Sequence, residues 1–419
     1  MSPETNWAGN VRFAPAAFAE PGSVSELQER VASARQVRVL GSGHSFSPLA
    51  ATDGLQISLR QLVSPAEVDP AARTASVAAG ATYAQIGAEL DAAGWALANM
   101  ASLPQITVAG ACATATHGSG LTNRCLAAAV TELELVTADG SLRTLGAADL
   151  AGAVVSLGAL GVVTRLRLAV EPRFEVAQRV WLEVPLAAAA ERLIEVLGLG
   201  YSVSLFTSWT VPDVVDQVWV KSRTGRPGPA DDATAALLDA LGGRPASRQV
   251  HPLPDADVAA TTPQLGRAGT WHERLPHFRP QAAPSGGGAE LQSEWLVGRA
   301  DGTAALLRLR ALAEQLAPAV SVCEIRAVAA DDLWLSPAYQ RDSVALHFTW
   351  RPRRSLVAQL IPVVEEALAP FEPRPHWGKL FTARPRLARG ADFRQLAARL
   401  DPEQRFTSDF VRRYVLDPG

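Results

Sequence analysis

The feature that most constrains this chain is a short β-type run that leads into a glycine-bounded turn. The run is Val37-Arg38-Val39-Leu40, and the turn is Gly41-Ser42-Gly43-His44-Ser45-Phe46. A strand that enters such a turn can aim successive backbone N–H groups at one point, which suits a pyrophosphate. Phe46 stands where a G-x-G-x-x-G fingerprint needs its third glycine, and no acidic ribose partner follows, so a nicotinamide site is disfavoured. Spacing alone leaves a plain turn and a cofactor loop as equal alternatives.

His44 bears on that choice. A histidine inside a tight glycine turn is poorly placed for a core role, and its imidazole can act as a nucleophile or a metal ligand. Only two of the seven histidines, His272 and His277, lie close together, and a separation of five residues is unsuitable for a ligand pair on a helix. The three cysteines form no CxxC pair. The sequence therefore predicts no metal site.

Two more segments, residues 101–120 and 156–163, are rich in glycine, alanine and hydroxylated residues. Small residues let the backbone approach a flat ligand closely, and hydroxyl groups offer it short hydrogen bonds. Each segment alone is equally well read as a loop crowded with small residues. Three such segments in one region, without a catalytic-triad elbow, favour a large and extended cofactor.

Length and charge set the broad class of protein. The chain of 419 residues, 48% of them hydrophobic, is long enough for two domains. A net charge of −3 gives no reason to expect a nucleic-acid groove or a polybasic membrane surface. The longest apolar stretch, Ala151 to Val163, is too short to span a bilayer, and the N-terminal residues do not resemble a signal peptide. We therefore expect a soluble, cytoplasmic protein that does not contact a membrane.

The pattern along the chain predicts two kinds of structure. Up to about residue 172, short strands and helices alternate: strands at Ala75–Gly80, Thr131–Thr137 and Gly161–Glu171, and a helix at Tyr83–Ala93. The middle contains two helix–strand–strand units, which predict an antiparallel sheet covered on one face. Their members are Ala187–Leu197, Tyr201–Thr207 and Gln217–Lys221, then Ala304–Leu316, Val320–Val328 and Ser343–Trp350, with a further helix at Leu356–Leu368. Residues 223–234 and 242–289 are expected to be loops.

Alternation in the second unit groups four polar side chains. Glu324 and Arg326 lie two apart on one expected strand, and His347 and Thr349 lie two apart on the next, so each pair shares a face. A solvated face is the ordinary reading of such a pattern, favoured about two to one. Histidine and threonine beside small residues favour a lined cavity instead. Lys379, one of only two lysines, lies in an apolar and aromatic stretch, where it is either a snorkelling residue or a desolvated amine.

Taken together, these motifs resemble one known family. They occur in the expected order over nearly the whole chain and are similar to the alditol oxidases, a group of vanillyl-alcohol-oxidase-type FAD flavoproteins whose near relatives are sugar-lactone oxidases. The matching segments are Asn6-Trp7-Ala8-Gly9-Asn10, Gly41 to Phe46, Asn99 to Gly120, Ser156 to Gly161, Glu324-Ile325-Arg326 and His376-Trp377-Gly378-Lys379.

The resemblance implies a two-domain α+β fold. Residues 1–172, with residues 380–419 packing back on them, would form the FAD-binding domain, and residues 173–379 an antiparallel-sheet substrate domain. His44 would be bonded to the 8-methyl carbon of the flavin. The remaining FAD-binding residues would be Gly41, Ser42, Gly43, Ser45, Phe46, Ser102, Thr107, Gly110, Thr114, Ala115, Thr116, His117 and Val163. Gln105 stands where the family has histidine, and Ala115 where it has glycine.

The resemblance also implies a reaction, in which the terminal hydroxyl of a polyol such as xylitol, sorbitol or glycerol is oxidised by hydride transfer to flavin. Oxygen would then be reduced to hydrogen peroxide. Arg326 is expected to act as an electrostatic anchor, with Lys379 as the first candidate for the base and His347 as the second. The polyol-binding residues would be Ser102, Glu324, Arg326, Thr349 and Lys379.

Two other functions stay open. One is a sugar-lactone oxidase or dehydrogenase on the same scaffold, and the other is a carbohydrate-binding or flavin-storage protein without turnover. The expected partners are a small polyol and molecular oxygen, without nucleic acid, and the protein is expected to be a monomer.

Overall fold

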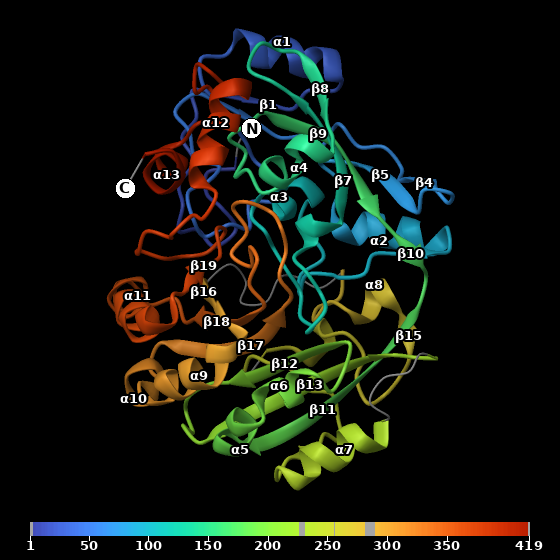
Figure 1. Cartoon of the computed structure of the whole chain (residues 1–419), viewed down its shortest axis with the longest axis vertical. Coiled ribbons are helices and arrows are strands. Elements are labelled where there is room, and N and C mark those ends of the chain that lie inside the picture. The colour runs from blue at the N-terminus through green and yellow to red at the C-terminus, as the bar shows by residue number, and fades with distance from the viewer. Residues whose placement is uncertain (1–2, 226–230, 255, 281–289, 418–419) are drawn as a thin grey trace.

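The computed structural model describes residues 3–225, 231–254, 256–280 and 290–417. These residues form two regions of sheet and helix that lie one above the other in Figure 1. The first region contains the N-terminal elements and the last helices of the chain, and the second is built on one large antiparallel sheet. No helix within the described ranges is long and apolar enough to cross a bilayer.

A small parallel sheet leads into the glycine turn. Its strands are β1 (Ala17–Ala19), β3 (Leu55–Ile57) and β2 (Val37–Val39), in that spatial order. Helix α1 (Val24–Ser33) begins where the Ser23 hydroxyl accepts a hydrogen bond from the Glu26 amide at 3.2 Å, and it buries Leu27 and Val31, one turn apart. Strand β2 pairs with β3 and leads directly into the turn that begins at Gly41.

An antiparallel sheet of five strands completes the first region. In spatial order the strands are β4 (Glu67–Asp69), β5 (Thr74–Ala78), β9 (Val162–Ala169), β7 (Val130–Val136) and β8 (Leu142–Leu145), and β6 (Trp95–Ala96) pairs separately with β10 (Glu171–Pro172). Helix α2 (Tyr83–Ala92) starts at a capping box made by Thr82 and Gln85. The other helices here are α3 (Val108–Ala113), α4 (Ala147–Ala153) and a 3₁₀ turn, η1 (Leu126–Ala129).

The second region is a nine-stranded antiparallel sheet. The spatial order is β14 (Arg244–Pro245), β11 (Glu175–Pro185), β13 (Val214–Arg223), β12 (Ser202–Thr207), β17 (Val320–Val328), β18 (Ser343–Trp350), β16 (Leu291–Gly298) and β19 (Arg374–Pro375), with β15 (Gly269–Thr270) paired to β11. Neighbouring strands pair with little interruption, so side chains on β16, β17 and β18 form rows across the sheet.

Helices cover one face of this sheet. They are α5 (Leu186–Glu191), α6 (Leu193–Leu197), α9 (Gly302–Arg310), α10 (Ala313–Leu316) and α11 (Arg354–Leu368), and their apolar residues share one core with Ile325, Leu346 and Phe348 of the strands. Leu238 of α7 (Asp231–Ala240) also belongs to this core, whereas Trp271 of α8 (Trp271–Arg274) belongs to the core of the first region. Because side chains alternate along a strand, the residues between these apolar ones point to the opposite face, toward the first region.

The C-terminal elements return to the first region, as Figure 1 shows for α12 (Gly390–Leu400) and α13 (Asp409–Val411). Gly152 of α4 has no room for a larger residue, because a Cβ there would lie 2.8 Å from Leu396 of α12. The Val37 amide donates to the Arg405 carbonyl at 2.8 Å, and a π-helical turn at Arg412–Leu416 follows α13. The last residues of the chain therefore support β2, the strand that precedes the turn.

Several elements differ from the sequence expectations. Strands β17 and β18 have the expected bounds, but β13 is longer than expected, and the helices expected at Ala187–Leu197 and Ala304–Leu316 are each divided in two. Helix α7 begins inside a segment expected to be a loop, and short elements occur within 242–280; residues 281–289 lie outside the described ranges. Strands β11 and β16 were not expected at all.

Candidate active site

One cavity of about 690 Å³ is lined by residues of both regions. On one side lie the turn at residues 41–46, the loop at 101–107 and the start of α3. On the other side lie polar residues of β16, β17 and β18 together with Gly378 and Lys379. A cavity that is continuous between two sheets suits a long ligand whose ends meet different chemistry.

The carbonyl groups of the turn are held by the N-terminal segment. The Trp7 amide donates to the carbonyl of residue 43 at 2.9 Å, and the side-chain amides of Asn6 and Asn10 donate to the carbonyls of residues 45 and 46 at 2.9 and 2.8 Å. The N–H and C=O of one planar peptide unit point in opposite directions. These bonds therefore turn the neighbouring N–H groups away from the N-terminal segment.

Four of those N–H groups stay unpaired. The Phe46 amide donates to the Gly378 carbonyl at 2.7 Å, whereas the amides of residues 42 to 45 donate to no other described residue. Gly43 has φ +71°, which lets the chain reverse between them. A row of free donors beside a cavity fits an anionic or acceptor-rich group, as the pyrophosphate and flavin of FAD would present.

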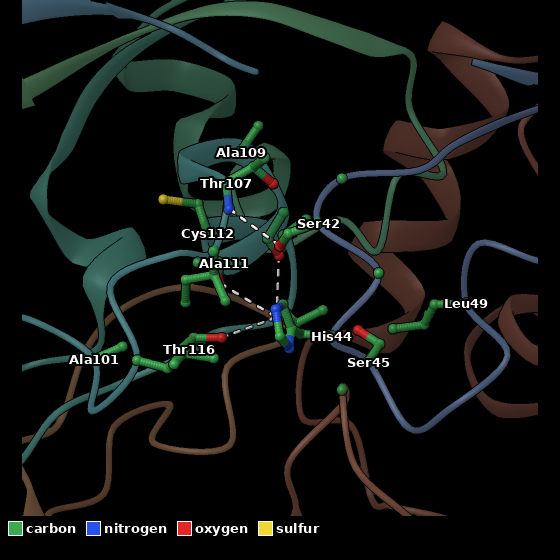
Figure 2. Close-up of a pocket in the computed structure, with 18 of the residues that line it drawn as sticks. Ser42, His44, Ser45, Leu49, Ala101, Thr107, Ala109, Ala111, Cys112 and Thr116 are labelled. Atoms are coloured by element: carbon green, nitrogen blue, oxygen red, sulfur yellow. Dashed lines mark hydrogen bonds between the residues drawn. The ribbon is translucent and has the colours of Figure 1, made fainter. Parts of the chain in front are cut away.

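The turn lies close to helix α3. The Ser42 hydroxyl accepts a hydrogen bond from the Thr107 amide at 3.3 Å, and Figure 2 shows the two side chains facing each other. A Cβ on Gly41 would lie 2.4 Å from the Thr107 hydroxyl, and one on Gly110 would lie 2.7 Å from it. Glycine at both positions is what allows this approach.

His44 lies in the cavity wall between the turn and Thr116, as Figure 2 shows. Its ring is 5.3 Å from that of Trp7, centre to centre. Burial lowers the pKa of His44 to about 4, because the charged imidazolium is poorly solvated there. The ring is therefore neutral near pH 7 and keeps a nitrogen lone pair, the form required of a nucleophile.

Of the other predicted cofactor residues, all but Ala115 line the cavity. Ser102, Thr114, Thr116, His117 and Val163 all line the same cavity. Ala115 lies outside the cavity lining: it is 1% exposed and has φ +54°, a left-handed conformation that explains why glycine is usual there. Gln105 donates to the carbonyls of Arg279 and Pro280, at 3.1 and 2.9 Å, and so ties its loop to the second region.

The polar face of the large sheet carries the four residues that alternation groups together. Glu324, Arg326, His347 and Thr349 all line the cavity, and Glu324 lies opposite His347 in the pairing of β17 with β18. The residues between them, such as Ile325 and Phe348, point into the helix-covered core. The interpretation as a lined cavity is therefore the correct one, and the solvated-face alternative is wrong.

The sequence reasoning missed Glu294 on β16. Its side chain is fully buried and lies next to His347 in the strand pairing. Its carboxylate is 2.5 Å from Arg326, 2.6 Å from Lys379 and 3.3 Å from His117. One carboxylate therefore joins the guanidinium, the amine and an imidazole that come from three other segments of the chain.

The charges of this cluster are mutually stabilised. Burial opposes ionisation of both carboxylates, but the neighbouring cations hold the pKa of Glu294 and that of Glu324 well below the usual range. Burial lowers the pKa of Lys379, although Glu294 acts in the opposite sense. Arg326 stays charged at any working pH. The cluster therefore combines two carboxylates with two cations.

His347 differs from its charged neighbours. Burial, with Lys379 nearby, lowers its pKa to about 4, so the ring is neutral near pH 7. Its Nδ1 is 3.4 Å from Glu324, and its Nε2 contacts no hydrogen-bond partner within the described ranges. With the proton on Nδ1 facing the carboxylate, Nε2 presents a lone pair and is able to accept a proton.

Two further polar residues also line the cavity: Glu290, just before β16, and Gln292, within it. Gln292 donates to the Glu290 carboxylate at 2.7 Å, and burial raises the pKa of Glu290 to about 7. The apolar run Trp295-Leu296-Val297 was the available signal for this strand, but the preceding Gly- and Pro-rich segment was assigned as a loop up to residue 289.

Comparison with known families identifies both parts of the cavity. A family described as an FAD binding domain matches residues 15–146, which include the glycine turn and α3. A family described as D-arabinono-1,4-lactone oxidase matches residues 290–414, which include β16, β17, β18 and Lys379. The chain is therefore similar to an FAD-binding domain on one side of the cavity and to a lactone oxidase on the other.

Individual proteins match nearly the whole chain. Alditol oxidase of a Streptomyces species is 46% identical over 97% of this chain and 98% of its own length, and L-gulono-1,4-lactone dehydrogenase of Mycobacterium tuberculosis is 31% identical over the full length of both. A solved structure of a solvent-stable cholesterol oxidase, 17% identical, has a TM-score of 0.76 over 98% of this chain and 97% of that one, which shows a shared fold. The chain belongs to the alditol oxidase family of FAD-dependent oxidoreductases, with the sugar-lactone oxidases and dehydrogenases as more distant relatives.

Proposed function

We propose that this protein oxidises the terminal hydroxyl of an alditol, such as xylitol, sorbitol or glycerol, to the aldehyde of the aldose. The observation that carries the proposal is the single cavity, which joins the free N–H groups of the turn at residues 41–46 to the charged face of the large sheet. Identity of 46% with an alditol oxidase over nearly the whole chain supports the choice of substrate. FAD would occupy the end between the turn and α3, and the polyol the end at the sheet.

FAD held at this place would supply a two-electron acceptor for the substrate's hydride, with oxygen as the final acceptor and hydrogen peroxide as the product. We propose that His44 holds it covalently, since a neutral, buried imidazole in the cavity wall is suited to nucleophilic attachment. The FAD-binding part would comprise residues 1–172 and 380–419, and the substrate part residues 173–379. The hydrogen bonds that Val37 and Arg38 of β2 donate to the carbonyls of Arg405 and Phe406 support this division.

The residues at the sheet would manage the substrate's proton and charge. Loss of hydride is easier from an alkoxide, so the hydroxyl proton must be accepted and negative charge stabilised. Lys379 donates to Glu294 at 2.6 Å and so holds its proton, whereas the Nε2 atom of His347, whose residue lines the cavity, has no hydrogen-bond partner among the described residues. We propose His347 as the proton acceptor, with Arg326 and Lys379 stabilising the oxygen anion.

The remaining polar groups would select a polyol over a simple alcohol. Glu324 can accept hydrogen bonds from neighbouring hydroxyls, and Thr349 and Ser102 line the same cavity. A buried site that bonds several hydroxyls disfavours an alcohol without them, since its polar groups would then stay unpaired.

A sugar-lactone oxidase or dehydrogenase is the second candidate. It is favoured by the match of residues 290–414 to the arabinonolactone oxidase family and by 31% identity with a gulonolactone dehydrogenase. The identity with that protein is lower than with the alditol oxidase, so we place this function second.

The test is to measure hydrogen peroxide release by the purified protein with xylitol, sorbitol, glycerol and L-gulono-1,4-lactone. Turnover of the polyols above that of the lactone is expected. Turnover of the lactone alone would replace the proposal by the second candidate, and no turnover with any of them would exclude both.

Covalent attachment is tested separately, by mass spectrometry of the denatured protein. The flavin mass should stay on the peptide that contains His44 and be absent from the His44→Ala variant. Flavin that is released entirely on denaturation would rule out the covalent bond while leaving the proposed reaction open to its own test.

A further inference from the structure

The other lysine of the chain, Lys221, is buried beside His277, which lines the cavity. It lies on β13, with Ser202 of β12 opposite it, and is 1% exposed. Its ammonium group donates to the carbonyls of Leu275 and Pro276, at 2.5 and 3.0 Å, and lies 3.1 Å from Nδ1 of His277. None of the sequence motifs that predict the cofactor or the substrate includes Lys221.

His277 connects this lysine to the candidate substrate site. Its Nε2 is 2.8 Å from Oε1 of Glu324, and the rings of Trp219 and Phe206 pack edge-on against it with ring centres at 5.2 and 5.6 Å. The ring is 5% exposed and lines the cavity. Lys221, His277 and Glu324 therefore form a continuous buried chain from β13 to the site.

The chemistry of the three groups sets the direction of every hydrogen bond. An ammonium group has donors only, so Nδ1 of His277 must accept. A neutral imidazole that accepts at one nitrogen carries its proton on the other, so Nε2 donates to the Glu324 carboxylate. Burial lowers the pKa of His277 to about 4, with Lys221 acting in the same sense, and the neutral form follows from that. Lys221 and Glu324 thus favour the same tautomer of His277, the one with its proton on Nε2.

We infer that Lys221 and His277 are positioning residues for Glu324: the lysine keeps Nδ1 of the histidine an acceptor, so that the Nε2–H holds one carboxylate oxygen and leaves the other for the polyol. The inference rests on the proposed function for its substrate. With Oε1 held by His277, Oε2 is the oxygen that lies 3.5 Å from Arg326 and 3.4 Å from His347. Without the lysine, only the carboxylate would favour this tautomer, and any population of the other tautomer would set a nitrogen lone pair against Oε1 of Glu324.

A purely structural role explains the burial of this lysine poorly. Burying an ammonium group is costly unless hydrogen bonds compensate, and a methionine would fill similar space without that cost. The two carbonyls that Lys221 contacts belong to the same segment as His277, so they hold the amine beside the imidazole.

The charge of Lys221 depends on pH, so a change of pH is a second way to perturb the hydrogen bonds that join Lys221, His277 and Glu324. The groups facing it are Gln178 of β11, Ser202 of β12 and, through His277, the Glu324 carboxylate, with Arg326 beyond it. Burial lowers the pKa of Lys221 to about 7, against an opposing effect of Glu324. Raising the pH through that value removes the charge, and a neutral amine no longer forces Nδ1 to accept.

The experiment combines nitrogen NMR of isotope-labelled histidine with steady-state kinetics on the flavin-loaded protein. At about pH 6 the wild type should show His277 protonated at Nε2 only, whereas Lys221→Met should show the Nδ1 tautomer in part or in full. The KM for xylitol should rise about tenfold in this variant, with kcat within about twofold. Raising the pH of the wild type to about 8.5 should produce the same tautomer shift without a mutation.

Thr262→Val is the matched control. It removes hydrogen bonds of 2.9 Å to the same Pro276 carbonyl and of 3.4 Å to the His277 carbonyl without changing any charge, so it should leave both the tautomer and the KM unchanged. An unchanged tautomer in Lys221→Met and at high pH would overturn the inference, and so would equal effects of the control. A wild type that does not oxidise polyols would defeat the proposed function alone, because the tautomer is measured without substrate.

Discussion

At the scale of single residues, the site depends on how four charges share a small volume. Glu294 lies between Arg326 and Lys379, and Glu324 lies between Arg326 and the histidines. Each carboxylate is ionised because cations surround it, and each cation is retained because a carboxylate faces it. A negative charge that forms on a bound oxygen would meet the cations of this cluster without a change in the protein.

Glu294→Gln should therefore damage both stability and catalysis. Removing one partner of a buried ion pair costs about 3 to 5 kcal/mol, because Arg326 and Lys379 lose their counter-charge. Urea unfolding would measure that loss, and peroxide release with xylitol should fall along with it. Glu195→Gln, which breaks an exposed pair with Arg192, is the control and should change neither quantity. Wild-type stability in Glu294→Gln would show that the cluster is not mutually stabilised.

The proton acceptor has a distinct pH signature. His347 must be neutral to accept a proton, and its pKa is lowered to about 4, so activity that depends on it is lost only as the pH falls through that value. The rate of flavin reduction at saturating xylitol should then be flat from about pH 5 to pH 8. Stopped-flow absorbance of the flavin measures it. A rate that climbs steadily over this range would instead favour Lys379 as the base.

His347→Gln should lower the same rate by about a hundredfold or more, the usual contribution of a positioned base. Lys379→Met should also slow flavin reduction more than it weakens polyol binding, because charge develops only during the reaction. A normal reduction rate in His347→Gln would exclude the imidazole as the acceptor.

At the scale of elements, the turn at residues 41–46 works because other segments fix its carbonyls. Asn6 and Asn10 hold two of them, and the Trp7 amide holds a third. In the sequence, the motif Asn6-Trp7-Ala8-Gly9-Asn10 is only part of a family resemblance. The structure shows its physical role, which is to orient the backbone N–H groups of the turn. The close approach of Gly41 to Thr107 then sets the width of the cavity at this end.

Gly41→Ala should disturb this end of the cavity. The added Cβ would lie 2.4 Å from the Thr107 hydroxyl, so the turn must move away from α3, at a cost of about 1 to 3 kcal/mol. The ratio of flavin to protein absorbance in the purified protein should fall. Gly22→Ala, where the added atom meets nothing within 4 Å, should retain full flavin content. Equal flavin content in the two variants would contradict this account of the turn.

The sequence predicts helices and strands best where polar and apolar residues recur with a clear period. Alternation gave β17 and β18 their bounds and put Glu324, Arg326, His347 and Thr349 on one face. It did not reveal Glu294, because β16 follows a Gly- and Pro-rich segment and its role depends on partners more than 30 residues away. The chain from Lys221 to Glu324 was equally invisible, since strands β13, β12 and β17 become neighbours only in the folded sheet.

At the scale of the whole molecule, one buried guanidinium joins distant parts of the first region. Arg38 of β2 donates to the carbonyls of Leu49, Leu157, Gly158 and Phe406, which belong to three separate segments. Burial lowers its pKa to about 10, so it stays charged near pH 7. Arg38, in the strand that leads into the turn at residues 41–46, therefore also holds the C-terminal segment in place.

Arg38→Met should consequently destabilise the region as a unit. Four buried carbonyls would lose their donor, and we expect a loss of about 3 kcal/mol in the free energy of unfolding. Calorimetry of the flavin-loaded protein would detect the lower melting temperature. Arg30→Met, which removes an exposed pair with Glu26, should melt with the wild type. Identical melting of the two variants would show that Arg38 does not join these segments energetically.

The burial of both lysines has a practical consequence. Lys221 is 1% exposed and the side chain of Lys379 is 13% exposed, while every other basic side chain able to meet solvent is arginine or histidine. Amine-directed reagents should therefore leave the outer surface of the folded protein largely unlabelled. Gentle reductive methylation with isotope-labelled formaldehyde would place its lysine signals only at these two amines. The same scarcity makes amine coupling to a solid support a poor choice for this enzyme, and arginine- or terminus-directed attachment a better one.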